Sequence, residues 1–182
     1  QFILSEPTFT TDSTRTFRFY APRGLAFNES IIDQRAGGKW NSQRWIFSRN
    51  ASMTLDAHNV VVEGLQFHSG GLSFSAEYDA PYVKDCIIRC HTAGSAYGIL
   101  FNGAGSTIGT VDNCIIYGGF ARGIARYYDG AGRIVYVRNS TISGCSTSGI
   151  AARKANSIYA INCAVFNNAD DFLAGILHDP AP

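Results

Sequence analysis

The chain has 182 residues, of which 46% are hydrophobic and 16% are charged, and its formal net charge is +1. This composition is typical of one domain that buries a hydrophobic core of its own. The near-neutral charge argues against binding to nucleic acid or to an anionic membrane surface. No apolar run is long enough to span a bilayer. The start has neither Met nor the pattern of a signal peptide, so we expect a start that was processed or that lies upstream.

The residue types favour short strands joined by tight turns. Gly occurs 19 times, whereas Met occurs once and Pro five times. Gly together with β-branched and aromatic residues is typical of strands and turns rather than of helices. The five cysteines are an odd number, so at least one thiol is free or pairs outside the chain.

The first 59 residues predict three strands. Phe17 and Phe19 alternate with their neighbours over residues 16–20, which is the pattern of a half-buried strand, and the Pro-Arg-Gly of residues 22–24 ends it. Residues 45–47 and 53–55 predict two further strands that lead into the valines at 60–62. We interpret residues 1–59 as an N-terminal cap with the first, irregular coils of a stacked structure.

A six-residue segment recurs five times in residues 60–182, starting at Val61, Val83, Val111, Val137 and Ala160. We expect its first position to point into a core, together with its fourth position (Gly64, Cys86, Cys114, Ser140 and Cys163). The sixth position is mostly branched and aliphatic, with Gln66 as the exception. The third position holds Glu63, Asp85, Asn113, Asn139 and Asn162. Asn tolerates the left-handed backbone of a sharp bend, and we expect stacked Asn side chains to bond one another between coils.

A second, shorter segment recurs between these copies at Gly71-Leu72, Gly98-Ile99, Gly123-Ile124, Gly149-Ile150 and Gly175-Ile176. Both segments repeat about every 25 residues. That period is too short for a helical hairpin, and no window has helical apolar spacing. Three short strands and their turns fit it, with about 4.8 Å between successive coils.

These two sets of columns resemble those of right-handed β-helix proteins, a group that includes pectate-lyase-like enzymes and phage tailspikes. The resemblance covers about residues 60–180. It implies an all-β, single-stranded right-handed parallel β-helix, with an irregular N-terminal cap in residues 1–59 and regular coils with a short C-terminal tail in residues 60–182. We therefore expect Cys86 and Cys114 to be neighbours in space.

The N-terminal part has a more specific resemblance. Its motifs are TDST at residues 11–14, FRFYAP at 17–22, GKWN at 38–41 and VEGLQ at 62–66. They resemble β-helix proteins of tailed phages and marine metagenomes, which are usually regarded as virion-associated. The resemblance implies a structural virion protein, namely a capsid decoration, head fibre or tail appendage, assembled in a bacterial cytoplasm. Its partners would be capsid or tail proteins and further copies of itself, with Trp40, Tyr78, Tyr127 and Tyr128 as contact anchors.

An alternative is an extracellular or virion enzyme, or a binding module, for cell-surface polysaccharide. Charged and aromatic residues follow the second repeated segment on successive coils: Glu77, Tyr78 and Asp79; Arg126, Tyr127, Tyr128 and Asp129; Arg153 and Lys154; His178 and Asp179. Stacked coils could bring them to one side of the rod as a glycan groove. A lyase needs a base and a cation that neutralises the substrate carboxylate. The catalytic candidates would then be Arg126, Asp129, Arg153 and Lys154. The competing interpretation is that each residue lies on a solvated turn.

No cofactor or metal is predicted. The acids do not repeat at one column, as a calcium-dependent lyase would require. Cys86, Cys90 and His91 lack further converging zinc ligands, so we interpret the cysteines as reduced core thiols. Such thiols agree with assembly in a cytoplasm. The Gly-rich stretches at 103–106 and 130–132 are predicted to be turns, because no Lys and no helix follow them.

Overall fold

The computed structural model describes residues 3–5, 16–21, 39–42, 46–48, 52–75, 80–90, 96–102, 108–127, 134–152, 158–173 and 176–178, the first and last of these ranges by their backbone only. The regular elements in these residues are twenty β-strands arranged in three sheets. Sheet 1 contains β1 (Ile3–Ser5), β4 (Met53–Asp56), β7 (Leu72–Phe74), β10 (Tyr97–Phe101), β13 (Arg122–Arg126), β16 (Ser148–Ala152) and β19 (Asp170–Leu173). Sheet 2 contains β2 (Phe17–Tyr20), β5 (Val60–Glu63), β8 (Tyr82–Lys84), β11 (Ile108–Asp112), β14 (Ile134–Arg138), β17 (Ile158–Ile161) and β20 (Ile176–His178). Sheet 3 contains β3 (Ile46–Ser48), β6 (Gln66–His68), β9 (Ile87–Cys90), β12 (Ile115–Gly118), β15 (Thr141–Ser143) and β18 (Ala164–Phe166).

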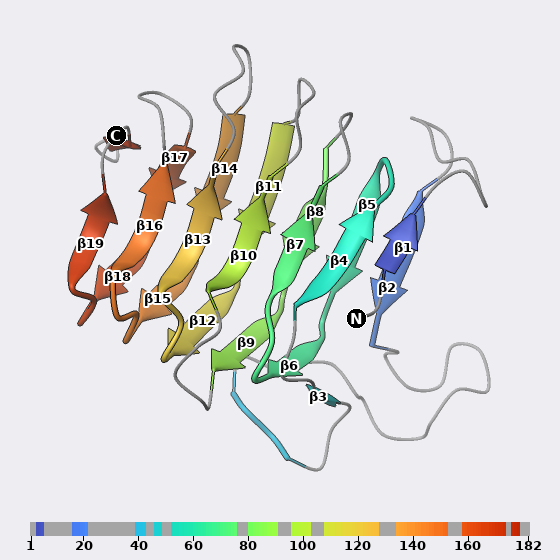
Figure 1. Cartoon of the computed structure of the whole chain (residues 1–182), viewed down its shortest axis with the longest axis horizontal. Coiled ribbons are helices and arrows are strands. Elements are labelled where there is room, and N and C mark those ends of the chain that lie inside the picture. The colour runs from blue at the N-terminus through green and yellow to red at the C-terminus, as the bar shows by residue number, and fades with distance from the viewer. Residues whose placement is uncertain are drawn as a thin grey trace.

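The chain winds through the sheets in the order 2, 3, 1, so that each strand pairs with the strand three places further along. For example, β8 pairs with β11 and β11 with β14, and both pairings are parallel. The coils stack from β1–β3 at one end to β18–β20 at the other (Figure 1). This architecture is a parallel β-helix and confirms the predicted fold. The strands predicted around residues 16–20, 45–47 and 53–55 are also confirmed as β2, β3 and β4, although Trp45 lies outside the described residues.

The core lies between the three sheets and consists of columns of similar side chains. Alternation along each strand sends every second residue inward. The inward column of sheet 2 is Val62, Val83, Val111, Val137 and Ala160; that of sheet 3 includes Phe67, Ile88, Ile116 and Ile142; and that of sheet 1 includes Leu72, Ile99, Ile124 and Ile150. All of these residues are buried. Each large aliphatic side chain contributes about 1.5–3 kcal/mol relative to exposure.

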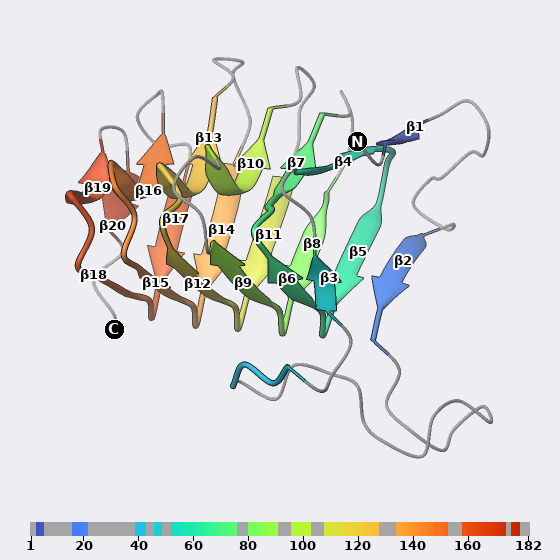
Figure 2. The same ribbon diagram turned by 60° about the horizontal axis from the view of Figure 1, so that its bottom comes forward.

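The bend between sheets 2 and 3 is formed by the predicted polar column. Asp85, Asn113, Asn139 and Asn162 have φ values of 54°, 50°, 50° and 52°. The predicted side-chain bonds between coils are present: the Asn113 amide donates to Asp85 at 2.7 Å, and the Asn162 amide donates to Asn139 at 2.8 Å. Figure 2 shows these bends as a row of sharp corners along one edge of the rod.

The first copy of the long repeat was predicted one residue out of register. Val62, not Val61, pairs with Val83, so Gly64, with φ of 69°, occupies the bend in place of Glu63. Phe67, not Gln66, then continues the sixth column, since Phe67 pairs with Ile88. The three consecutive valines at 60–62 made either alignment possible. A slip of one residue exchanges the inward and outward faces of a strand.

The last copy of the second segment was also predicted wrongly. Phe172 of β19 pairs with Ile150, whereas Ile176 belongs to β20 and pairs with Ile158 in sheet 2. The last coil is therefore shorter than the Gly-Ile spacing suggested. Gly175 lies outside the described residues.

The residue directly after each of the Asp and Asn bends has a small side chain that donates a hydrogen bond. The thiols of Cys86, Cys114 and Cys163 point to the carbonyl two residues earlier at 3.2, 3.2 and 3.3 Å, and the Ser140 hydroxyl does the same at 2.7 Å. All five cysteines are free thiols. Burial raises the pKa of Cys114 well above its usual value, and the adjacent Cys86 raises it further. The Ile115 N–H donates to the Cys86 carbonyl at 2.9 Å, and Ile115 pairs with Ile87, which confirms that Cys86 and Cys114 are neighbours on adjacent coils.

Candidate functional sites

An open pocket of about 240 Å³ lies on sheet 1, where it spans three neighbouring strands. It is lined by Arg122 and Arg126 of β13, Tyr127 next to that strand, Ala151 and Ala152 of β16, and Leu173 of β19. The pocket therefore combines two guanidinium groups and a phenol with an apolar floor.

The pocket arises because a column of large side chains is interrupted by a small one. Phe74, Phe101, Arg126 and Ala152 occupy successive rungs of sheet 1. The rings of Phe74 and Phe101 stack with centroids 5.4 Å apart. Arg126 takes the next rung and is only 5% exposed. Ala152 then leaves the space beside Arg126 unfilled, and Ala151 adds a second small residue to the floor.

Arg122 and Tyr127 form one wall of the pocket, and Tyr97 packs against both of them. The two phenol rings meet edge to face with centroids 5.5 Å apart, and the Arg122 guanidinium lies 5.9 Å from the Tyr97 ring and 5.6 Å from the Tyr127 ring. Burial raises the pKa of Tyr97, and its interaction with Tyr127 raises it further. Tyr97 therefore stays neutral at pH 7, and the positive charge beside it comes from Arg122. Such a wall favours a ring-shaped ligand that carries a carboxylate or sulfate group.

Two of the predicted site residues, Arg126 and Tyr127, are brought together in this pocket. The other predicted residues on the turns, which are Glu77, Tyr78, Asp79, Tyr128, Asp129, Arg153, Lys154 and Asp179, lie outside the described residues. His178 is described by its backbone only and belongs to β20 of sheet 2, not to sheet 1. The prediction missed Arg122 and Tyr97. The sequence could have indicated both residues, because each lies two positions before the Ile of the second repeated segment, at Ile99 and Ile124.

The predicted anchor Trp40 lies on sheet 3, away from Tyr127. Its ring packs 5.7 Å from His68 and 5.5 Å from the Arg89 guanidinium. The adjacent Asn41 is held by Gln66, which is fully buried: the Gln66 side chain accepts from the Asn41 backbone N–H at 2.7 Å and donates to its carbonyl at 3.0 Å. Trp40 and Asn41 of the GKWN segment thus attach to the outer face of β6.

A second candidate surface is the outer face of sheet 2, which carries two continuous columns. One column contains Arg18, Val61, Tyr82, Thr110, Tyr136 and Tyr159, and the other contains Tyr20, Glu63, Lys84, Asp112, Arg138 and Ile161. Four successive rungs of the second column alternate in charge, from Glu63 to Arg138. A tyrosine directly precedes the inward residue in three of the five repeats, at Tyr82, Tyr136 and Tyr159. This recurrence was overlooked in the sequence.

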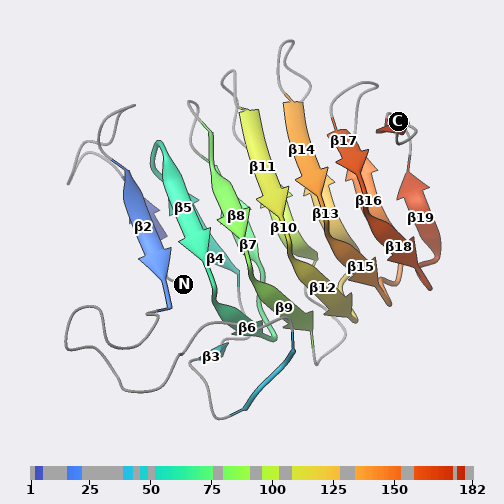
Figure 3. The ribbon, with the colours of Figure 1, turned by 180° about the vertical axis from the view of Figure 1, so that it is seen from behind.

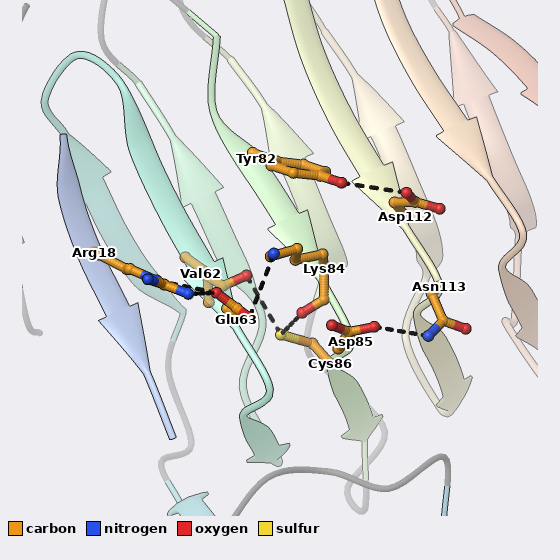
Figure 4. A network of polar contacts seen from close by, with 9 residues as sticks. All are labelled: Arg18, Val62, Glu63, Tyr82, Lys84, Asp85, Cys86, Asp112 and Asn113. Carbon is orange, nitrogen blue, oxygen red and sulfur yellow. Dashed lines mark hydrogen bonds and ion pairs between the residues drawn. The ribbon is translucent and has the colours of Figure 1, made fainter. Parts of the chain in front are cut away.

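Polar contacts join charged residues of neighbouring strands on this face, and Figure 4 shows Glu63 between Arg18 and Lys84 and, separately, Tyr82 bonded to Asp112. Glu63 is 3% exposed and pairs with Arg18, whose Nε lies 3.0 Å away, and with Lys84 at 3.3 Å. The Tyr82 hydroxyl donates to Asp112 at 3.2 Å. Burial raises the pKa of Tyr82, and Asp112 raises it further. Arg138 lies over the Tyr136 ring at 5.0 Å, and the rings of Tyr136 and Tyr159 stack at 5.5 Å.

No group of three or more His, Cys, Asp or Glu side chains converges as a metal site within the described residues. In the same part of the chain, no helix has the length and apolar character to cross a membrane.

A family model described as a right-handed β-helix region matches residues 87–179, about half of the chain. The chain belongs to the right-handed β-helix family. The region typical of this family includes the whole pocket on sheet 1 and the larger part of sheet 2. Comparison with curated proteins and with solved structures gave no match. Membership in the family establishes the fold but assigns no activity, because one fold hosts many functions.

Proposed function

We propose that the protein is a structural component of a phage virion, as a capsid decoration, head fibre or tail appendage. The observation that carries the proposal is a set of side-chain ladders that link successive coils from Asp85 to Asn162. Asn amides bond across the bends, and inward side chains stack in like columns. A rod built in this way is a stiff spacer with a large lateral surface.

The resemblance of the GKWN and VEGLQ motifs to virion-associated β-helix proteins supports this role. In the structure these two motifs contact each other, because Gln66 of one holds the backbone of Asn41 in the other. The partners would be capsid or tail proteins together with further copies of this chain. Reduced thiols agree with assembly in a bacterial cytoplasm before incorporation into the particle.

The proposal is tested by quantitative mass spectrometry of purified particles. We expect the protein at a fixed copy number relative to the major capsid protein, and expect it to remain after a high-salt wash. Recovery of the protein only as a free molecule outside the particles would overturn the proposal.

The pocket on sheet 1 favours a second candidate function, namely binding or cleavage of an acidic polysaccharide. Arg122 and Arg126 would bind a carboxylate or sulfate group, while Tyr127 and Ala151 would contact the sugar ring. The space of about 240 Å³ is sufficient for one sugar ring. As an enzyme the protein would act outside the bacterial cell, with Arg126 as the described catalytic candidate and Asp129, Arg153 and Lys154 as further candidates.

This candidate is tested with a panel of acidic and neutral polysaccharides. We expect acidic chains to bind, and Arg122→Ala to weaken that binding about tenfold, since charge-assisted hydrogen bonds are worth about 1.5–3 kcal/mol. Arg89→Ala, on sheet 3, is the matched control. New reducing ends or unsaturated products would show cleavage. Equal binding by the wild type and the Arg122 variant would exclude the pocket.

A further inference from the structure

Two of the three exposed large hydrophobic side chains among the described residues lie on the outer face of sheet 2. Ile108 is 50% exposed and Tyr20 is 43% exposed, whereas the third, Phe166 at 45%, lies on sheet 3. The strands of sheet 2 from β2 to β17 lie side by side on one flank of the rod (Figure 3). Tyr20 ends β2 and Ile108 begins β11, three rungs away, so this face carries separate apolar side chains among charged ones rather than one apolar patch. A mixed surface of this kind is compatible with an interface, because interfaces between proteins that also exist apart are about as apolar as the rest of the protein surface.

The residues along each outward column of sheet 2 complement the same column read in the opposite direction along the rod. Consider a two-fold axis that runs along the strand direction between β8 and β11. It places each column against the same column of a second copy, with the order of the coils inverted. Lys84 then faces Asp112 of the second copy, and by symmetry Asp112 faces Lys84. Tyr82 faces the smaller Thr110, and Val61 faces Tyr136.

The remaining rungs match in the same way. Tyr82 and Thr110 are paired in register, and Ala80 and Ile108 each lie two residues before them. Extending this register beyond the start of β8 places the exposed Ile108 opposite the small Ala80 of the second copy. Tyr20 faces Ile161, and Arg18 faces the Tyr159 ring, as a cation over an aromatic face. Glu63 comes opposite Arg138 in this arrangement but adds no contact of its own, because Glu63 is buried and already paired with Arg18 and Lys84.

The other closed arrangement is less favourable. A two-fold axis parallel to the rod would reverse the strand direction, so that Ile108 would face Asp112 on the same rung. Tyr82 and Tyr136 would each face their own copies. In that arrangement the apolar Ile108 faces the Asp112 carboxylate, and bulky tyrosines face each other. Both contacts are less favourable than those of the first arrangement.

We propose that the outer face of sheet 2 is an isologous interface at which two copies of this chain associate face to face with their rods antiparallel. In a two-fold interface each complementary pair occurs twice. This inference does not depend on the proposed virion role, since it rests only on the pattern of the face.

The size of the face predicts a weak dimer. Strands of five residues at about 3.3 Å per residue and six rungs at about 4.8 Å give about 400 Å² of flat area per copy. That places the interface below the standard size of about 1,600 Å² in total and among weak or transient interfaces. We therefore expect a dissociation constant in the micromolar range or weaker, unless further contacts in the particle add to it.

Sedimentation velocity over a series of protein concentrations tests the proposal. We expect a monomer–dimer equilibrium for the wild type. Ile108→Lys should weaken the dimer at least about tenfold, because it places a charge against the apolar Ala80 position. Phe166→Lys, an equally exposed hydrophobic position on another sheet, is the control and should leave the dimer unchanged. Circular dichroism checks that both variants are folded.

A mixing experiment tests the register. Ala80→Glu and Ile108→Lys should each weaken self-association. A mixture of the two variants should form heterodimers more tightly than either variant self-associates, because position 80 of one copy faces position 108 of the other. A wild type that stays monomeric to about 1 mM, forms trimers, or loses its dimer with Phe166→Lys would overturn the proposal. So would a mixture that associates no better than its components.

Discussion

Backbone conformation at the bend accounts for the asparagine column. A non-glycine residue in the left-handed region costs roughly 1–2 kcal/mol, and Asn tolerates it better than most residues. Asn139 adopts φ of 50°, and its side chain donates to Asp112 at 3.0 Å and accepts from Asn162 at 2.8 Å. One residue type therefore provides both the bend and the link to the coils on either side.

Substitution of Asn139 separates these two contributions. Asn139→Ala should lower the free energy of unfolding by about 1–3 kcal/mol, because it introduces backbone strain and removes the side-chain bonds. Asn139→Gly should cost less, since Gly adopts this conformation without strain. Urea denaturation measures both variants. Equal losses for Ala and Gly would show that backbone strain does not determine the residue at this bend.

The buried thiols predict loss of stability at alkaline pH. Burial and the nearby Cys90 raise the pKa of Cys145 from 9.0 to about 11. Between these values the unfolded chain releases a proton that the folded protein retains, so unfolding becomes more favourable as the pH rises. The raised pKa values of Cys114, Tyr82 and Tyr97 act in the same direction.

We therefore expect the urea midpoint to fall progressively from about pH 9 to pH 11. Cys145→Ala, compared with the wild type at each pH, should reduce the slope of this fall, because it removes one of the titrating groups. An unchanged slope would mean that Cys145 does not contribute to the pH dependence.

At the scale of the elements, polar links attach the first coil to the regular stack. The strand β2 pairs with β5, and Arg18 of β2 pairs with the buried Glu63, which also contacts Lys84 of β8. Three successive strands of sheet 2 are thus joined through one carboxylate. On sheet 3, Gln66 has a similar role when it holds Asn41 against β6.

Glu63→Gln tests this link between strands. It leaves two cations beside a neutral amide and should cost about 1–2 kcal/mol, less than a fully buried pair, because Arg18 is about half exposed. Hydrogen exchange should show lost protection first in β2. Asp170→Asn, on an exposed position of β19, is the control and should leave β2 unchanged. Uniform loss of protection over the whole chain would contradict a local role.

At the scale of the whole molecule, each coil contacts only its neighbours, so stability is a sum of coil and interface contributions. The coils are packed closely: a Cβ atom on Gly123 would lie 2.4 Å from the Ile142 side chain of the next coil. Damage at one coil should therefore spread to its neighbours and fade with distance along the rod.

Ile116→Ala should show this spread. Removing a fully buried aliphatic side chain should cost about 2–5 kcal/mol. Hydrogen exchange should then accelerate in β9, β12 and β15 more than in β2 or β5. Phe166→Ala, at an exposed position outside the proposed interface, should change stability by less than about 0.5 kcal/mol. A fully cooperative loss that includes β2 to the same extent would argue against coil-by-coil stability.

The fold could be derived from the sequence because each coil repeats the same local requirements. Three features recur about every 25 residues: an Asn or Asp at the bend, a small residue after it, and inward Val or Ile side chains. The positions of the strands follow from these features. The errors occurred at the two ends, at Val62 and Phe172. There the repeat is ambiguous or the coil is shorter, so spacing alone does not fix the register.

The candidate sites were less accessible to sequence reasoning. Arg126 and Tyr127 were identified by residue type, and the tyrosine and charge columns of sheet 2 were missed. Whether two outward residues lie on adjacent rungs depends on the strand register, because the loops between coils differ in length and a slip of one residue turns a side chain to the other face. The sequence by itself therefore determined the type of coil, its bends and its core columns. Only the tertiary structure decided which outward residues from different coils lie together, because those neighbours are joined by pairing between strands and not by the local chain.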